Sequence, residues 1–116
     1  MANSIERPPH GIVSPPTQAC TKPEPGLRRQ VLVHSPAMML VRHEMEKGWR
    51  GTVHSHPHEQ MVYVLSGSIQ ITVNGVSMNA SAGDNFIVAS NAEHQASALE
   101  DSVVLDIFTP ARLDYL

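Results

Sequence analysis

The sequence has little of what marks several large classes of protein. It contains one cysteine, Cys20, which excludes an internal disulfide. The eight lysines and arginines form no basic stripe, and the net charge is −3 with histidine neutral, which argues against a nucleic-acid partner. No apolar run approaches the about 20 residues of a membrane-spanning helix, and the N-terminus lacks the basic and then apolar layout of a signal peptide. We therefore expect a cytoplasmic protein with no membrane partner.

Proline divides the 116-residue chain into two parts. Residues 1–26 hold six of the nine prolines. Because proline fixes φ and removes a hydrogen-bond donor, this N-terminal arm is expected to be extended or disordered and not helical. It is either a free tail or an arm that packs on a partner subunit. Residues 27–116 have the length of one domain with one core.

The second part of the chain predicts strands. Short β-rich runs alternate with turn signals, and Asn74-Gly75 between two of them is a strong hairpin signal. At this spacing about nine strands are expected, with no helix pattern before Pro110. The runs lie at residues 29–34, 37–45, 60–67, 68–73, 76–81, 84–89, 94–100 and 102–108. This pattern predicts an all-β domain, either an antiparallel sandwich or a barrel.

Histidine is the unusual feature of the composition. The chain has seven, four of them between residues 54 and 94. In the stretch HSHPHEQ, a strand would direct His54 and His56 to the same face, as a chelating pair requires. Pro57 lacks an N–H and indicates a bend or bulge, so His58 need not follow that pair.

Two further residues extend the pair to a set of four ligands. If the strand resumes in register after Pro57, Gln60 points inward, and His94 follows a turn-rich stretch farther along the chain. Three imidazoles and one oxygen are a plausible set for a first-row transition metal. The alternative is that surface histidines cluster by chance, but the polar oxygen and the distant histidine together favour a metal site.

The same residues resemble the cupin family. The spacing of the first cupin motif is matched by five residues: Gly48, His54, His56, Gln60 and Gly67. That motif normally has glutamate where this chain has Gln60. The resemblance covers about residues 28–112 and implies a cupin jelly-roll (double-stranded β-helix) barrel with a metal inside, usually in a homodimer.

The second cupin motif is matched less fully. Gly83 and His94 have the expected spacing, so His94 is the residue that the resemblance identifies as a ligand. Ala89, Asn91 and Ala98 stand where the motif usually has proline, glycine and asparagine.

Within the cupins, the chain resembles the KdgF-like proteins of pectin and alginate breakdown. The stretches HSHPHEQ, YVLSG and LDIFTPARLDYL carry this resemblance. In that group three histidines and a glutamine hold the metal, which here implies His54, His56, Gln60 and His94. The group converts 4,5-unsaturated monouronates into linear keto sugars, so the resemblance implies a small anionic sugar acid as substrate.

Asp106 is the one acid inside the apolar run SVVLDIF. A carboxylate in such a run costs several kcal/mol unless it is paired or hydrogen-bonded. If its face is the barrel interior, Asp106 lies near the metal, where it could carry a proton. It could instead orient a ligand histidine or bond to the backbone. The family pattern implies catalytic roles for Asp106, for Phe108 packing the sugar ring, and for Arg112 clamping a carboxylate; a plain surface arginine is the alternative.

The amide at position 60 affects the net charge of the expected metal site. Gln60 offers an oxygen without charge, so three neutral imidazoles and this amide leave the full +2 charge on a divalent ion, which then attracts an anion. Glu59 competes for the ligand role, but it is one residue short of the cupin spacing. It is expected on the outer face of the barrel or behind the metal ligands, where it would contact a ligand and not the metal. His58 is expected at the mouth of the site or behind the metal ligands.

These observations predict a metal-dependent isomerase of unsaturated uronates. The reaction needs acid–base help but no redox change, so the divalent ion could be Zn, Ni, Mn, Co or Fe. Two alternatives remain open: a metal-dependent cupin oxygenase or lyase on another small molecule, and a non-catalytic cupin that binds a small metabolite.

Overall fold

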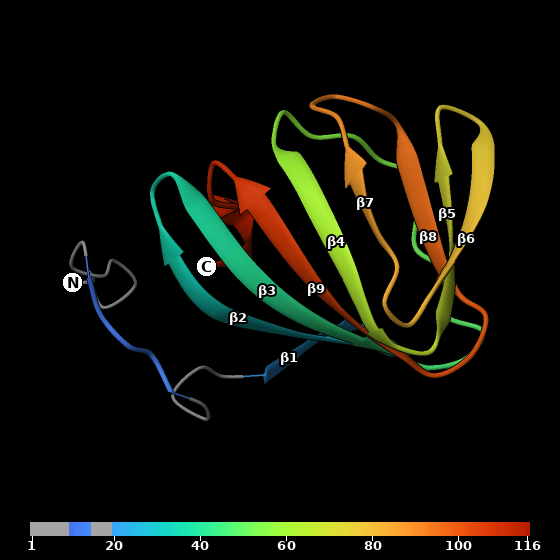
Figure 1. Cartoon of the computed structure of the whole chain (residues 1–116), viewed down its shortest axis with the longest axis horizontal. Helices are drawn as coiled ribbons and strands as arrows, with labels where there is room; N and C mark the ends of the chain where they lie inside the picture. The colour runs from blue at the N-terminus through green and yellow to red at the C-terminus, as the bar shows by residue number, and fades with distance from the viewer. Residues whose placement is uncertain (1–9, 15–19) are drawn as a thin grey trace.

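The computed structural model describes residues 10–14 and 20–116. This part of the chain forms antiparallel strands and one short C-terminal 3-10 helix, which confirms the predicted all-β class (Figure 1). The elements are β1 (Cys20–Glu24), β2 (Leu27–Ser35), β3 (Met38–Met45), β4 (Glu59–Ser66), β5 (Ser68–Val73), β6 (Val76–Ser81), β7 (Asn85–Val88), β8 (His94–Ala98), β9 (Ser102–Thr109) and η2 (Leu113–Tyr115).

The strands form two sheets. The larger has the order β1-β2-β3-β9-β4-β7, and the smaller has the order β6-β5-β8. Strand β9, near the C-terminus, lies between β3 and β4, so segments far apart in the sequence meet at the centre of the larger sheet (Figure 1). In the described residues no helix has the length and apolar character needed to cross a membrane.

The predicted hairpin turn is confirmed. Val73 pairs with Val76, and the two residues between them, Asn74 and Gly75, have φ of +47° and +82°. Positive φ at both central positions is the requirement of the two-residue turn whose twist matches that of the flanking strands. Asparagine and glycine are the residues that adopt this conformation at little cost.

Strand β1 lies within the segment expected to be an arm. Residues Cys20–Glu24 pair with β2 at the edge of the larger sheet, although Pro23 lies inside the strand. An edge strand tolerates proline because one row of its N–H groups needs no partner. The rest of the arm falls mainly on residues 1–9 and 15–19, which lie outside the described residues, and the division at residue 26 stays a prediction.

The inner face of the larger sheet contributes to two apolar clusters, and the first of them also takes Ile69, Ala80 and Ala98 from the smaller sheet. One contains Leu27, Met45, Val62, Val64, Ile69, Ala80, Ala98 and Val104. The other contains Val31, Met39, Val41, Phe108 and Ala111. On β2, β3 and β9 the inward position between the two clusters is polar, and these positions hold Arg29, His43 and Asp106. A polar row therefore crosses an otherwise apolar face.

Two motif positions have a structural explanation in the backbone. Gly67 has φ of +85°, and a Cβ there would lie 2.3 Å from the carbonyl oxygen of Asp101 and from Ser102 Oγ, so no side chain fits. Asn91 replaces the usual glycine of the second motif and has φ of +64°. Asparagine adopts this left-handed conformation more readily than most residues, which explains how the turn is kept without glycine.

Candidate metal centre

Three histidines from two distant segments converge in the barrel. His54 and His94 exchange backbone hydrogen bonds of 3.0 and 2.8 Å, which fixes the loop before β4 against the start of β8. His56 lies two residues beyond His54 on the same loop. One ring nitrogen from each of the three histidines lies within 4.8 Å of the others, a spacing that could hold a metal ion.

Backbone carbonyls orient all three rings in the same way. In each ring Nδ1 lies within hydrogen-bonding distance of a carbonyl oxygen, which can only accept, so Nδ1 carries the proton. The pairs are His54 with Thr52 at 3.0 Å, His56 with His58 at 3.0 Å and His94 with Ala92 at 2.9 Å. Each neutral ring therefore presents the lone pair of Nε2, the form that ligates a metal.

The surroundings favour neutral imidazoles. Burial lowers the pKa of His56, and the positive charges of Arg112 and His94 lower it further. Burial also lowers the pKa of His94, against the opposing effect of its hydrogen bond to the carbonyl of Ala92. Metal binding requires the deprotonated ring, so these shifts act in the direction that a metal site needs.

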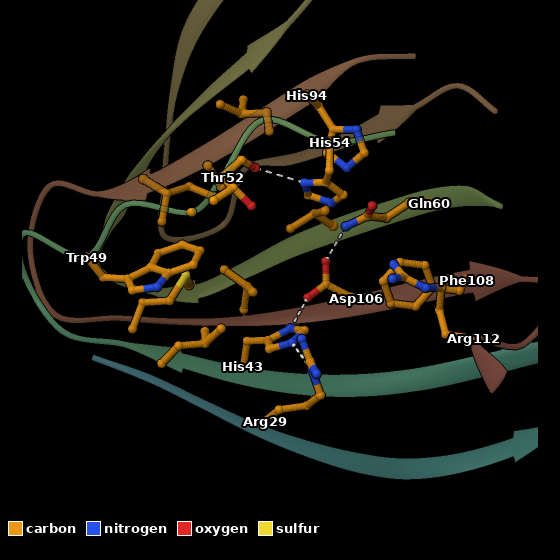
Figure 2. Close-up of a pocket in the computed structure, with 18 of the residues that line it drawn as sticks. Arg29, His43, Trp49, Thr52, His54, Gln60, His94, Asp106, Phe108 and Arg112 are labelled. Atoms are coloured by element: carbon orange, nitrogen blue, oxygen red, sulfur yellow. Dashed lines mark hydrogen bonds and ion pairs between the residues drawn. The ribbon is translucent and has the colours of Figure 1, made fainter. Parts of the chain in front are cut away.

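Gln60, on β4, supplies a possible fourth metal ligand. Its Oε1 lies 3.2 Å from His56 Nε2, and its Nε2 donates to Asp106 Oδ1 at 2.7 Å (Figure 2). His56 thus has an oxygen acceptor near both ring nitrogens, but a neutral ring has one proton. One of these two contacts must join two acceptors, and a cation between Nε2 and Oε1 would remove the conflict. The residues present therefore fit a divalent metal ion.

Asp106 is buried, 4% exposed, and both of its oxygens are occupied. Oδ1 accepts from Gln60, and Oδ2 lies 2.7 Å from His43 Nδ1. The acid therefore contacts the amide and not a histidine of the cluster. Arg29 lies behind His43, with its Nε 3.0 Å from His43 Nε2.

Arg29 and His43 were absent from the residues predicted from sequence. Both line the cavity together with Asp106. The signal for His43 was present in the run AMMLVRHEM, because alternation puts it on the same face as the buried Met39, Val41 and Met45.

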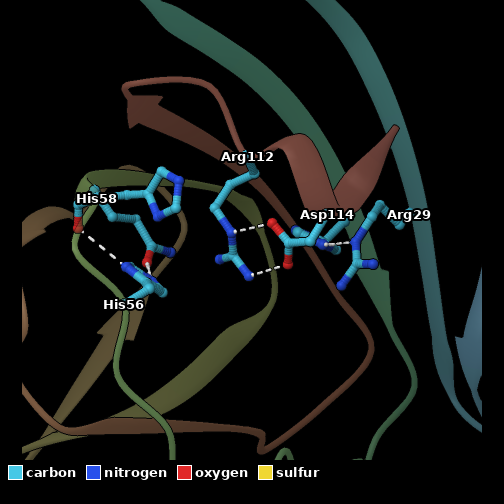
Figure 3. A network of polar contacts seen from close by, with 7 residues as sticks. Arg29, His56, His58, Arg112 and Asp114 are labelled. Atoms are coloured by element: carbon cyan, nitrogen blue, oxygen red, sulfur yellow. Dashed lines mark hydrogen bonds and ion pairs between the residues drawn. The ribbon is translucent and has the colours of Figure 1, made fainter.

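Arg112 is not a surface residue: it is 9% exposed. Its guanidinium forms two hydrogen bonds with Asp114, of 2.9 and 2.7 Å (Figure 3). Its guanidinium carbon also lies 4.3 Å from the ring centroid of Tyr115. Burial disfavours its charge, but the hydrogen bonds to Asp114 and the neighbouring acids raise the pKa of Arg112 overall. Arg112 is therefore a fixed cation on the wall of the cavity.

Phe108, His58 and Glu59 take three different positions. Phe108 is 1% exposed, and its ring centroid lies 5.8 Å from that of His56. His58 is partly buried against Phe108 at 6.3 Å, and among the described residues no hydrogen-bond partner faces its Nδ1. Glu59 is exposed on β4, as expected for a residue outside the barrel.

A cavity of about 330 Å³ is lined by several of these residues: His54, Gln60, His94, Asp106, Phe108 and Arg112. This volume lies at the small end of the range for ligand sites, about 300–1,000 Å³, and suits a single sugar ring. Among the lining residues, His54, Gln60 and His94 offer possible metal ligands, whereas Arg29 and Arg112 supply positive charge. Trp49 also lines the cavity, with its indole N–H donating to Glu24 on β1 at 2.6 Å. The cavity can hold a small anion against a metal.

Comparison with known proteins identifies the family. Residues 41–108 match the model of the cupin domain. The pectin degradation protein KdgF of Dickeya dadantii is 34% identical over 93 residues, covering 78% of this chain and 84% of that protein.

Solved structures give the same result. KdgF from a Halomonas species has a TM-score of 0.86 and 34% identity, covering 92% of this chain and 99% of that one. An RmlC-like cupin from Shewanella frigidimarina has a TM-score of 0.82 and 34% identity, covering 86% and 90%. The jelly-roll prediction is confirmed, and the chain belongs to the cupin family, among its KdgF-like members.

Proposed function

We propose that the protein is a metal-dependent isomerase that converts 4,5-unsaturated monouronates into linear keto sugars. The observation that carries the proposal is the amide of Gln60, which donates to Asp106 and whose oxygen faces Nε2 of His56 in the cluster of three histidines. The name of the Dickeya dadantii relative, a pectin degradation protein, supports this class of substrate. A cytoplasmic location stays a prediction.

His54, His56, His94 and Gln60 are the proposed metal ligands. None of them carries a negative charge, so a divalent ion held there would keep its full charge and would act as a Lewis acid toward a substrate anion. The choice among Zn, Ni, Mn, Co and Fe stays open, because the reaction requires no change of oxidation state.

Asp106 is the proposed acid–base group. Linearisation moves a proton from the C1 hydroxyl to C4 and breaks the bond between C1 and the ring oxygen. C1 becomes an aldehyde and C5 a ketone, with no atom or electron gained or lost. The Asp106 carboxylate lines the cavity and keeps lone pairs free beyond its bonds to Gln60 and His43, so it can accept the proton and return it to C4.

Arg112 and Phe108 are the proposed substrate-positioning groups. The Arg112 guanidinium retains N–H donors beyond those bonded to Asp114 and faces the cavity as a fixed cation for the substrate carboxylate. Phe108 supplies an apolar surface between that cation and the histidines, with its ring 5.1 Å from the Arg112 guanidinium.

Proton NMR of 4,5-unsaturated galacturonate tests this function. The metal-loaded protein should abolish the vinyl signal, because linearisation converts C4 into a saturated carbon. Protein stripped by a chelator should lose this activity and regain it when metal is restored. A vinyl signal that persists with metal-loaded protein refutes the proposal. Saturable binding without turnover would then indicate a binding protein, and oxygen consumption would indicate an oxygenase.

Asp106→Asn tests the proton transfer and should lower turnover by about 100-fold or more at saturating metal, the effect of losing one acid–base group. The asparagine amide would also face Gln60 donor to donor or lose its match to His43. The matched control is the double variant Asp106→Asn with Gln60→Glu, which restores donor–acceptor complementarity. Turnover should stay low in the double variant while metal binding recovers. Recovery of turnover with metal binding would make Asp106 a positioning residue only.

We also propose that the protein is a homodimer. On the outer face of the larger sheet, Met61, Tyr63, Leu65 and Ile87 are each 44–56% exposed, and Met61 pairs with Ile87 across β4 and β7. Apolar residues gathered beside an edge strand are typical of a surface that a second chain covers.

Light scattering at micromolar concentration should give the mass of a dimer. Met61→Lys should shift this mass toward the monomer, because a buried unpaired charge opposes association. Val76→Lys, on the exposed β6 of the other sheet, is the control and should leave the mass unchanged. A monomer mass for the unaltered protein would contradict the proposal.

A further inference from the structure

A chain of hydrogen bonds crosses the larger sheet from Arg29 to Gln60. Arg29 Nε lies 3.0 Å from His43 Nε2, His43 Nδ1 lies 2.7 Å from Asp106 Oδ2, and Gln60 Nε2 lies 2.7 Å from Asp106 Oδ1 (Figure 2). The four residues come from β2, β3, β9 and β4, which are neighbours in that order. The polar row between the two apolar clusters is therefore one connected network that ends at the proposed metal ligand.

Strand register explains how these residues meet. Arg29 is directly opposite His43, which is opposite Val104, two residues from Asp106 on β9. Gln60 is opposite Phe108, again two residues from Asp106. Diagonal neighbours on one face of a sheet lie within reach of long side chains, so alternation alone brings the four together.

The direction of each hydrogen bond is determined by chemistry. A guanidinium can only donate, so His43 Nε2 must accept and the ring proton lies on Nδ1. His43 Nδ1 then donates to Asp106, whose carboxylate accepts from both sides. Gln60 can satisfy Asp106 only with its NH₂ group, which leaves Oε1 to face His56.

Arg29 is itself held in place by the C-terminal segment. Its guanidinium carbon lies 3.7 Å from the ring centroid of Tyr115, on the same ring that Arg112 stacks against. Burial raises the pKa of Tyr115, so this ring stays a neutral phenol beside the two cations. Arg29, the first donor of the hydrogen-bond network, therefore has a fixed position.

We propose that His43 is a positioning residue which, held in one tautomer by Arg29, fixes Asp106 and thereby turns the oxygen of Gln60 toward the metal. The inference rests on the proposed metal site but not on the identity of the substrate. A purely structural role for His43 would affect the stability of the fold and leave the properties of bound metal unchanged.

Co²⁺ binding to His43→Phe and His43→Asn tests the proposal. Phenylalanine keeps a planar ring but donates no hydrogen bond, so Co²⁺ affinity should fall by about 10-fold or more, and the visible absorption of bound Co²⁺ should change. The amide nitrogen of asparagine can take the place of His43 Nδ1. The Co²⁺ affinity of this variant should therefore stay within about 3-fold of that of the unaltered protein. Affinity is measured by competition with a chromophoric chelator.

Two further variants make the outcome decisive even if His43→Phe does not fold. Arg29→Met removes the donor that fixes the tautomer of His43 and should lower Co²⁺ affinity several-fold. Val104→Ala removes packing opposite His43 but no hydrogen bond, and it should lower the thermal midpoint without altering the absorption of bound Co²⁺. Unaltered affinity and absorption in Arg29→Met, and in His43→Phe where it folds, would overturn the proposal. No uronate is used, so failure of the proposed reaction would leave this test standing.

Discussion

The hydrogen bond from Gln60 Nε2 to Asp106 Oδ1 connects the proposed metal site to the rest of the barrel. An amide has one donor end and one acceptor end, so the acid that binds the nitrogen determines where the oxygen points. A glutamate at this position would bring a second carboxylate against Asp106 and would require a shared proton. The amide instead donates to the acid and leaves its uncharged oxygen free to face a metal.

The same bond explains how a charge is tolerated inside the sheet. Asp106 lies between Val104 and Phe108 along the inner face of β9, where an unpaired carboxylate would cost several kcal/mol. Its two hydrogen bonds, to Gln60 and His43, satisfy it from both neighbouring strands. A fully connected polar network specifies one arrangement of side chains, whereas a partly connected one destabilises the fold. The two apolar clusters pack on either side of this network. Such packing favours one fixed arrangement, as the proposed roles of Gln60 and Asp106 require.

Local patterns in the sequence predicted the all-β class, the Asn74-Gly75 turn and the inward direction of Gln60, because alternation and turn chemistry are properties of neighbouring residues. Strand β1 was missed because prolines are read as breakers, although an edge strand admits them. The meeting of His54 with His94 depends on strand pairing that no spacing encodes, so His94 was only a candidate ligand until the resemblance to cupins supported it. His43 was overlooked although its inward parity was visible; its importance depends on Asp106, which lies far along the chain on a neighbouring strand.

The most direct test of this account is a crystal structure of the metal-loaded protein, with data collected at the absorption edge of the ion. The anomalous peak should lie about 2.0–2.3 Å from the Nε2 atoms of the three histidines and from Gln60 Oε1. Gln60 Nε2 should remain within hydrogen-bonding distance of Asp106 in the same structure. An ion bound elsewhere, Glu59 in place of Gln60, or an amide turned away from Asp106 would contradict the account.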